Sequence, residues 1–250
     1  NDSRGQLFHD YINVIRHKNP LFFVAENVSG ILSSRHKSAL ENIINNFKNA
    51  GEYGYNVSVE LLNSSDFDVP QDRKRVFFIG YRKDLNIKFD FSKLTKMKKI
   101  TLKEAIGDLH EGALPCEKSK SNGDKCIKPN HEYYVGSYSS IYMSRNRVRS
   151  WDEQSFTIQA GARHAPIHPQ APKMVFIEKN KRIFEPGKES LYRRLSVREC
   201  ARIQTFPDNY IFKYDNVEDG YKMVGNAVPV RLAKVIATNI YEDISKINNK

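Results

Sequence analysis

Long apolar runs and cysteines are both scarce in this 250-residue chain, and each scarcity excludes a class of protein. The longest unbroken apolar run is five residues, 21–25, against the roughly 20 that a membrane-spanning helix needs, so we expect no membrane partner. Cysteine occurs three times, at Cys116, Cys126 and Cys200, without a Cys-x-x-Cys pair, and we therefore predict no metal site. An odd number of thiols at this low density is typical of a reducing cytoplasm.

Negative charge is the other component in short supply. The chain carries 40 Lys and Arg against 29 Asp and Glu, a formal net charge of +11. Such an excess indicates a polyanionic partner, although charge alone does not separate DNA from RNA or from an anionic membrane surface.

The first eighty residues alternate between helical and strand patterns, which favours a parallel α/β sheet. Helical spacing is found at 7–17 and 38–47, and strand patterns at 21–25, 55–62 and 75–81. From about 100 to 210 the periodicity is irregular, which predicts a smaller domain of loops and short strands. Helical spacing returns at 221–250, and this tail is expected to pack on the first sheet.

These patterns divide the chain into three predicted parts. They are an α/β domain at 1–97, a second domain at 98–212 and a terminal helix at 213–250 that returns to the first domain.

Charged residues stand at the ends of two of the apolar strands. Glu26 directly follows the run at 21–25, and Arg73 and Arg75 lead into the run at 76–79. Strands of an open α/β sheet are apolar on both faces and ligands collect in the crevice at their ends, so these charges indicate an active site. The alternative is structural: Glu26 pairs with a surface lysine, and both arginines are solvated.

Five blocks, in this order, resemble the DNA cytosine-5 methyltransferases. They are residues 2–8 (Asp-Ser-Arg-Gly-Gln-Leu-Phe), 26–28 (Glu-Asn-Val), 71–75 (Gln-Asp-Arg-Lys-Arg), 198–207 (Arg-Glu-Cys-Ala-Arg-Ile-Gln-Thr-Phe-Pro) and 225–230 (Gly-Asn-Ala-Val-Pro-Val). The similarity covers nearly the whole chain and looks closest, through residues 143–149 and 168–172, to the HaeIII-type enzymes that modify GGCC. It implies an α/β fold with a methyltransferase Rossmann-like, mostly parallel sheet and a smaller, irregular target-recognition domain of β and loop structure.

Two motifs that the family carries upstream of the 2–8 block are missing from this sequence. They are the Phe-x-Gly-x-Gly loop for S-adenosylmethionine and the Pro-Cys-Gln motif that holds the nucleophile. The chain, which begins at Asn1, therefore resembles the carboxyl-terminal portion of a longer polypeptide or one half of a split enzyme. We expect it to need an amino-terminal part, fused or separate. Cys200 is predicted to be a buried structural thiol of a helix at 196–203.

The resemblance also implies catalytic roles. In the family a thiolate adds to C6 of cytosine, and C5 then attacks the methyl group of S-adenosylmethionine. Glu26 is implied at N3 and the exocyclic amine, where a pKa raised by burial would let it hold a proton. Arg75, and more loosely Arg73, are implied at the base carbonyl, where a guanidinium stabilises negative charge. Their spacing of two would place both on one face of an extended backbone.

Supporting roles follow from the same resemblance. Gln71 and Asn27 would hold the loop and the carboxylate through hydrogen bonds. Leu7 and Asn226 would complete the pocket for the cofactor S-adenosylmethionine, although core and cap roles explain these two nearly as well.

Reading of the DNA sequence is expected from arginines of the second domain. Arg145, Arg147 and Arg149 alternate with other residues, so a strand would send all three guanidiniums to one side, and arginine is the commonest reader of guanine in the major groove. Arg163 is a fourth candidate, because Gly161 allows a close approach of the backbone. The alternative is an exposed basic strand that contacts phosphates without reading bases.

Three functions remain open at this point. The first is a cytosine-5 methyltransferase acting on double-stranded DNA in the bacterial cytoplasm, with a restriction endonuclease of the same site as a conditional partner. The second is a non-catalytic, sequence-specific DNA-binding module or subunit, and the third is an RNA-directed relative of the same fold. Retention of Glu26, Arg73 and Arg75 favours the first, since a binding module needs no buried carboxylate.

Overall fold

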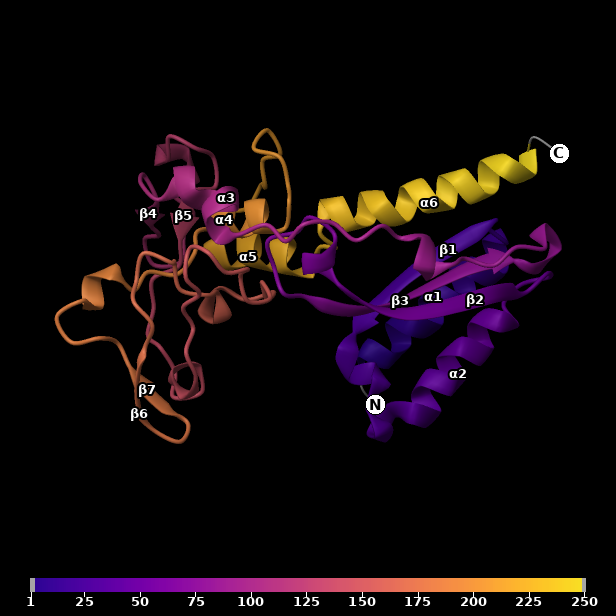
Figure 1. Cartoon of the computed structure of the whole chain (residues 1–250), viewed down its shortest axis with the longest axis horizontal. Helices are drawn as coiled ribbons and strands as arrows, with labels where there is room; N and C mark the ends of the chain where they lie inside the picture. Colours follow the sequence, from indigo (N-terminus) through magenta and orange to yellow (C-terminus); the bar gives the residue numbers. More distant parts are fainter. Residues whose placement is uncertain (1–2, 249–250) are drawn as a thin grey trace. The chain divides into compact units, whose positions relative to one another are not determined.

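The computed structural model describes residues 3–248, and the chain divides into two compact units (Figure 1). Unit 1 comprises Asn1–Asn63, Lys74–Lys96 and Val235–Lys250, and unit 2 comprises Ser64–Arg73 and Met97–Lys234. Residues 64–73 and 213–234 thus belong to unit 2, whereas the sequence patterns grouped them with the first domain and the terminal helix. Within the described residues, no helix has both the length and the apolar character that crossing a bilayer requires.

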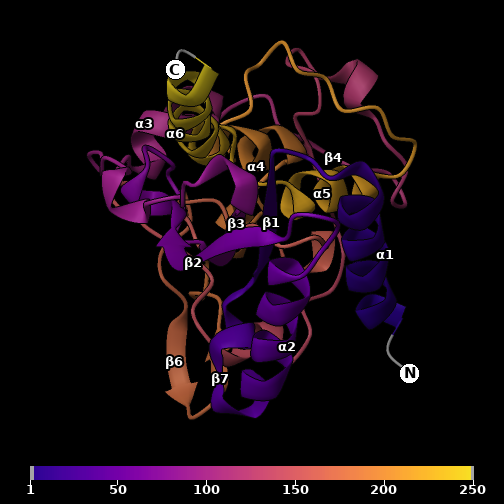
Figure 2. The ribbon, with the colours of Figure 1, turned by 90° about the vertical axis from the view of Figure 1, so that its right-hand side faces the viewer.

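Unit 1 is a three-stranded sheet between helices. Its elements are α1 (Ser3–Lys18), β1 (Phe22–Val28), α2 (Lys37–Lys48), β2 (Tyr55–Asn63), β3 (Lys74–Arg82) and the greater part of α6 (Val230–Asn248). Figures 1 and 2 show α1 and α2 on one face of the sheet and α6 on the other. Because side chains alternate along β3, the strand contacts the helices on both faces. Phe78 packs in the apolar cluster with α1 and α2, whereas Tyr81 donates a hydrogen bond to Asp243 of α6 at 3.0 Å.

The sheet has the order β1-β3-β2, and β3 pairs antiparallel with both neighbours. The α/β class is confirmed, but the parallel pairing predicted from the alternating pattern is wrong for these three strands. β1 and β2 run in the same direction, as their connection through α2 requires, yet β3 lies between them. The link from β2 to β3 contains a short 3-10 turn and no crossover helix, so β3 returns antiparallel.

β1 is covered on one face only, whereas its apolar run predicted a strand buried on both. Phe23 is 4% exposed and stacks on Phe47 of α2 with ring centroids 4.4 Å apart. On the opposite face Phe22, Val24 and Val28 are 41, 37 and 54% exposed. β1 is an edge strand of the described sheet, and apolar composition alone does not reveal which strand stands at an edge.

Unit 2 consists mainly of loops and short elements, as predicted for residues 100–210. It contains α3 (Leu102–Ile106), β4 (Leu114–Pro115), β5 (Glu132–Tyr133), β6 (Val175–Glu178), β7 (Lys181–Ile183), α4 (Val197–Ile203) and α5 (Val217–Asn226). One apolar cluster of unit 2 joins α3, α4 and α5 through residues such as Ile106, Cys200 and Val224. Another apolar cluster surrounds Tyr142 and Val148.

The block at 225–230 separates two helices, whereas the sequence patterns predicted a single terminal helix at 213–250. α5 ends at Asn226, Ala227 has an extended backbone, and α6 begins at Val230. Pro229 has no N–H to donate to a preceding turn, and the residue before a proline is disfavoured in the helical region, so the two helices stay separate. The helical spacing from Tyr221 onward therefore belongs to two helices.

We predict that Gly80→Ala destabilises unit 1. Gly80 pairs with Phe23 across the β1–β3 register, and a Cβ at Gly80 would stand 2.1 Å from Cε1 of the Phe23 ring. Overpacking of this kind costs about 1–3 kcal/mol, which urea unfolding would detect as a lower free energy of unfolding. Gly30→Ala is the matched control, because no atom lies within 4 Å of a Cβ at that position. Equal losses in the two variants would contradict the packing account.

Candidate active site

The charged residues at neighbouring ends of β1 and β3 form an ion pair. In the register of these strands Glu26 lies opposite Phe77 and Arg75 lies opposite Val28, which makes Glu26 and Arg75 diagonal neighbours on one face. Nε of Arg75 lies 2.9 Å from Oε1 of Glu26, and 17% and 25% of the two side chains are exposed. The structure thus pairs Glu26 with an arginine of the next strand, where the structural alternative had a surface lysine.

A pocket of about 410 Å³ lies in unit 1 at this end of β1. Glu26 and Asn27 line it together with Leu7 and Tyr11 of α1 and Phe78 of β3. The side-chain oxygen of Asn27 accepts a hydrogen bond from the backbone N–H of the next residue at 2.8 Å, which fixes the turn at the end of the strand. Apolar and aromatic walls with a few polar groups at one end are typical of a small-molecule site.

Arg73 and Gln71 belong to unit 2 and are almost fully buried there. Arg73 donates from Nη1 to the carbonyl of Ile158 at 3.0 Å and from Nη2 to the carbonyl of Gly225 at 3.1 Å. Because β3 begins at Lys74, the strand alternation that was expected to align Arg73 with Arg75 does not reach Arg73. Its guanidinium is engaged with main-chain carbonyls, a contact that the sequence did not predict.

Gln71 joins the same parts of unit 2. Its Nε2 donates to Oε1 of Gln204 at 2.8 Å, and its Oε1 accepts from the N–H of Ile158 at 2.7 Å. Gln204 in turn donates to the carbonyls of Val224 and Ala227 at 2.9 and 3.2 Å. Gln71 is thus held by side-chain hydrogen bonds to Gln204 and to the backbone of Ile158.

The backbone around Asn226 is fixed by close packing. A Cβ at Gly225 would stand 2.3 Å from the carbonyl carbon of Gln159, so the approach of these two chain segments requires glycine. Asn226 follows directly, exposed at the last position of α5. Its side chain is thereby presented from a rigid support.

The arginines expected to read DNA lie in an extended segment, and not in a regular strand. A single bridge, from Val148 to Ile167, is the only pairing found for residues 145–149. Val148 is buried, Arg145 is exposed, and Arg147 is half-buried. Arg163 is exposed on a 3-10 turn, Ala162–His164.

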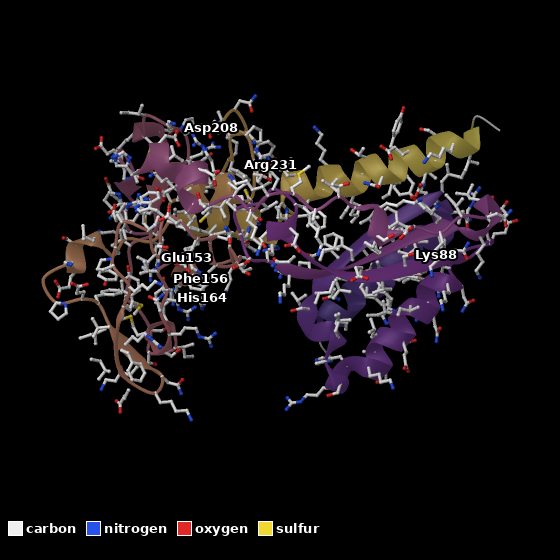
Figure 3. All side chains as sticks on the ribbon, in the orientation of Figure 1. Lys88, Glu153, Phe156, His164, Asp208 and Arg231 are labelled. Carbon is white, nitrogen blue, oxygen red and sulfur yellow. The ribbon has the colours of Figure 1, made fainter. Side chains whose placement is uncertain are left out.

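Arg149 differs from its neighbours because acidic groups hold it. Its guanidinium lies 2.9 Å from Oε1 of Glu153 and 3.4 Å from Oδ2 of Asp72, and 4.3 Å from the centroid of the Phe156 ring. Glu153, Phe156 and His164 mark this part of unit 2 in Figure 3. Hydrogen bonds from Ser150, with Arg149, lower the pKa of Glu153 to about 2, so the carboxylate stays charged at neutral pH.

A buried charge network that sequence reasoning missed centres on Glu199. Arg193 donates two hydrogen bonds to its carboxylate at 2.8 and 2.7 Å, and the N–H of Ser196 donates a third at 2.7 Å. Burial alone would raise the pKa of Glu199, but the hydrogen bonds and the positive charge of Arg193 hold it below its ordinary value. The signal that could have found it is the Ser-x-x-Glu capping box at the start of α4.

His168 completes this network in a neutral form. Nδ1 of its ring accepts from the N–H of Gln170 at 3.2 Å, so Nε2 carries the proton and lies 3.5 Å from Oε1 of Glu199. Burial lowers the pKa of His168 to about 4, even though Glu199 opposes that shift.

None of the three cysteines has the character of a nucleophile. Cys200 is fully buried, which confirms the predicted structural thiol, and burial raises its pKa well above the ordinary value. Burial also raises the pKa of Cys126, and Cys116 is 7% exposed. A thiol whose pKa is raised by burial, as in Cys126 and Cys200, is not a thiolate at neutral pH.

Comparison with known families decides the family of the chain. Residues 1–242 match the model of the C-5 cytosine-specific DNA methylases. The chain belongs to this family. The family uses S-adenosylmethionine as its methyl donor and DNA as its substrate, so the resemblance seen in the sequence blocks is confirmed, and the chain is a cytosine-5 methyltransferase of this family.

Two relatives illustrate the similarity within the C-5 cytosine-specific DNA methylases. The Type II methyltransferase M.MthTI of Methanothermobacter thermautotrophicus is 56% identical over 248 residues, which are 99% of this chain and 74% of the relative. The Type II methyltransferase M.FnuDI of Fusobacterium nucleatum is 54% identical over 98% of this chain and 71% of its own length. The chain therefore spans about three quarters of the length of these relatives.

Solved structures show that the fold is shared far beyond these relatives. A prophage-encoded protein of E. coli, assigned as a DNA modification methyltransferase, superposes with a TM-score of 0.68 at 21% identity, over 98% of this chain and 76% of that one. The Dnmt2 methyltransferase of S. pombe gives a TM-score of 0.60 at 18% identity, over 98% and 74%.

We predict that His168 makes unit 2 of this methylase chain sensitive to acid. Its folded pKa of about 4 lies below its ordinary value of 6.5, so its neutral form stabilises the fold above pH 6.5 and this contribution is lost as the pH falls toward 4. In His168→Gln the free energy of unfolding should fall less steeply over this window, by up to about 1.4 kcal/mol per pH unit.

Urea unfolding at a series of pH values measures this slope. His164→Gln is the matched control, because His164 is exposed, and it should keep the slope of the unsubstituted chain. A His168→Gln slope equal to that of the control would show that His168 contributes nothing to the acid sensitivity.

Proposed function

We propose that this chain forms the carboxyl-terminal part of a restriction–modification cytosine-5 methyltransferase that methylates a flipped cytosine within a short duplex site, GGCC. The observation that carries this proposal is the Glu26–Arg75 pair, 2.9 Å apart beside a pocket in unit 1. The similarity to Type II methyltransferases supports the restriction–modification context. In that context the enzyme acts in the bacterial cytoplasm and protects DNA from an endonuclease of the same site.

Glu26 and Arg75 act on opposite sides of the flipped base in this proposal. Cytosine C5 is a weak nucleophile, and addition of a thiolate to C6 activates it only if charge that develops on the ring is neutralised. Glu26 holds or shares a proton at N3 and contacts the exocyclic amine. Arg75 faces the base carbonyl, where its permanent charge stabilises the negative charge that appears there. Both side chains are partly exposed, so a base can reach them.

The guanidinium of Arg75 has enough N–H donors to contact the base carbonyl in addition to its partners within the chain. Nε contacts Glu26, and Nη1 donates to the carbonyl of Lys74 at 2.9 Å. The pairing therefore orients the guanidinium while a third nitrogen, Nη2, serves the base. Arg73 is buried in unit 2 and does not contact the base in this proposal. It donates a hydrogen bond to the carbonyl of Gly225 and thereby helps to position the next residue, Asn226.

The pocket in unit 1 fits part of S-adenosylmethionine, which supplies the electrophilic methyl group. Leu7, Tyr11 and Phe78 offer apolar surface for its adenosine moiety, and the volume of about 410 Å³ is in the range of small-molecule sites. Leu7 is 68% exposed at the rim of the pocket, where a bound cofactor would cover it. Asn27 keeps the end of β1 in place. Asn226 of unit 2 stays a candidate for cofactor binding through its place in the block at 225–230.

The nucleophile and the first cofactor loop come from an amino-terminal part, fused or separate, in this proposal. Two observations support it. Burial raises the pKa of Cys126 and of Cys200 and leaves Cys116 only 7% exposed. The face of β1 that carries Phe22, Val24 and Val28 is exposed, as expected for a surface that another segment covers.

DNA reading is assigned to the arginines of unit 2. Arg145 and Arg163 are exposed and Arg147 is half-buried on a fixed backbone, whereas Arg149 is held by Glu153 and Asp72 and would read bases only after exchanging these partners. A non-catalytic DNA-binding module remains the second candidate, because the described residues include no nucleophilic thiol.

Glu26→Gln separates these two candidates. In the enzyme reconstituted with its amino-terminal part, loss of the carboxylate should slow methyl transfer to GGCC duplex by about 10²–10⁴-fold and leave the Kd for DNA nearly unchanged. Glu60→Gln is the matched control, because Glu60 of β2 lies opposite the same residue of β3, Phe77, on the other side. A Glu26→Gln enzyme that transfers methyl groups as fast as the Glu60→Gln control would exclude Glu26 from the chemistry.

A further inference from the structure

Arg194 of unit 2 is buried inside a cage of tyrosine rings. It is 1% exposed, and among the ion pairs of the described residues none involves it. Nη1 donates to the carbonyl of Gly136 and Nη2 to the carbonyl of Ser137, each at 3.1 Å. Its guanidinium carbon lies 5.2, 4.0 and 5.5 Å from the ring centroids of Tyr134, Tyr138 and Tyr142, respectively.

A guanidinium in such surroundings dictates the shape of the segment around it. Burying a charge is costly unless hydrogen bonds and compensating charge density replace the lost water. Here two carbonyls and the negative faces of three rings replace it, and cation–π attraction strengthens as water is excluded. A lysine could not make the same set of contacts, because it lacks the planar fork of donors. Residues 134–142 are therefore held in one conformation around Arg194.

Tyr142 connects this cage to a candidate DNA-reading residue. It is 2% exposed, and its hydroxyl donates to the carbonyl of Ala165 at 2.7 Å. The guanidinium of Arg147 lies 4.7 Å from the centroid of the same ring, and Nε of Arg147 donates to the carbonyl of Tyr142 at 2.9 Å. Arg147 is thus oriented by a tyrosine whose own place Arg194 fixes.

We propose that Arg194 is a positioning residue for DNA reading: it fixes Tyr142 and, through that ring and its carbonyl, the direction in which Arg147 meets the duplex. The inference rests on the proposed function and adds to it a buried residue that does not contact DNA. Without Arg194, Arg147 keeps its charge but loses its fixed orientation. Contacts to phosphates tolerate that loss, whereas contacts to base edges do not.

Arg198 provides a matched control within unit 2. It is also 1% exposed and also donates to main-chain carbonyls, those of Pro129 and Tyr210, at 2.9 Å each. These partners lie outside residues 134–149. Arg198→Met therefore removes a buried guanidinium of the same kind without touching the support of Arg147.

The test is a double-mutant cycle read by DNA binding of the full chain. Kd is measured for a GGCC duplex and for the same duplex with GCGC in its place. The specificity is the Kd for the GCGC duplex divided by the Kd for the GGCC duplex. Arg194→Met and Arg147→Ala should each lower this ratio by about tenfold, with the Kd for the GCGC duplex changing much less. The double variant should lose no more than either single variant, whereas Arg198→Met and Arg147→Ala should act independently.

Two results would overturn the inference and leave the proposed function intact. In the first, the losses of specificity from Arg194→Met and Arg147→Ala multiply in the double variant. In the second, Arg194→Met weakens binding to both duplexes equally. If Arg194→Met does not fold, Tyr142→Leu and Tyr142→Phe replace it. Leucine should lower specificity because the ring is gone, and phenylalanine should keep it; equal specificity in both would also overturn the inference. An unsubstituted chain without preference for GGCC would overturn the proposed site together with the inference.

Discussion

The insertion of β3 between β1 and β2 is the constraint on which unit 1 depends. Val76, Phe77, Phe78 and Ile79 of this strand are each at most 2% exposed, so both faces of the sheet pack on it. Its antiparallel register with β1 places Arg75 diagonally across from Glu26, and the ion pair at 2.9 Å follows from that register. A slip of one residue would turn Arg75 to the opposite face and separate the pair.

Buried arginines, rather than a sheet, hold the loops of unit 2 together. Its strands are two to four residues long, too short to organise the long loops between them. Arg73, Arg194 and Arg198 are each at most 2% exposed, and each donates to carbonyls of chain segments that lie far from it in the sequence. A guanidinium offers five N–H donors in a rigid fork, which suits it to satisfy irregular backbone that has no strand partner. The excess of positive charge is therefore not all available to a polyanion, since part of it holds the loops together.

The sequence predicted the helices and strands of unit 1, the irregular second region, the buried Cys200 and the family, because these depend on local apolar periodicity and on short blocks. It did not predict the antiparallel return of β3 or the exposed face of β1, because pairing direction and edge position depend on which elements neighbour a strand. Spacing predicted that Arg73 and Arg75 lie on one face of an extended backbone. Because β3 starts at Lys74, Arg73 is instead buried and donates to main-chain carbonyls, whereas Arg75 forms a partly exposed ion pair. The roles of Arg193, Arg194 and Glu199 depend on contacts between segments that lie apart in the chain. Only Glu199 has a signal in the sequence, the capping box at the start of α4.

We propose that Glu26 and Arg75 complete an active site whose nucleophile lies on another segment. The most direct test is transfer of labelled methyl from S-adenosylmethionine to a GGCC duplex, measured for this chain alone and after addition of the amino-terminal segment of a relative. The account predicts transfer only in the mixture. Transfer by the chain alone, or no transfer in a mixture that still binds the duplex, would contradict it.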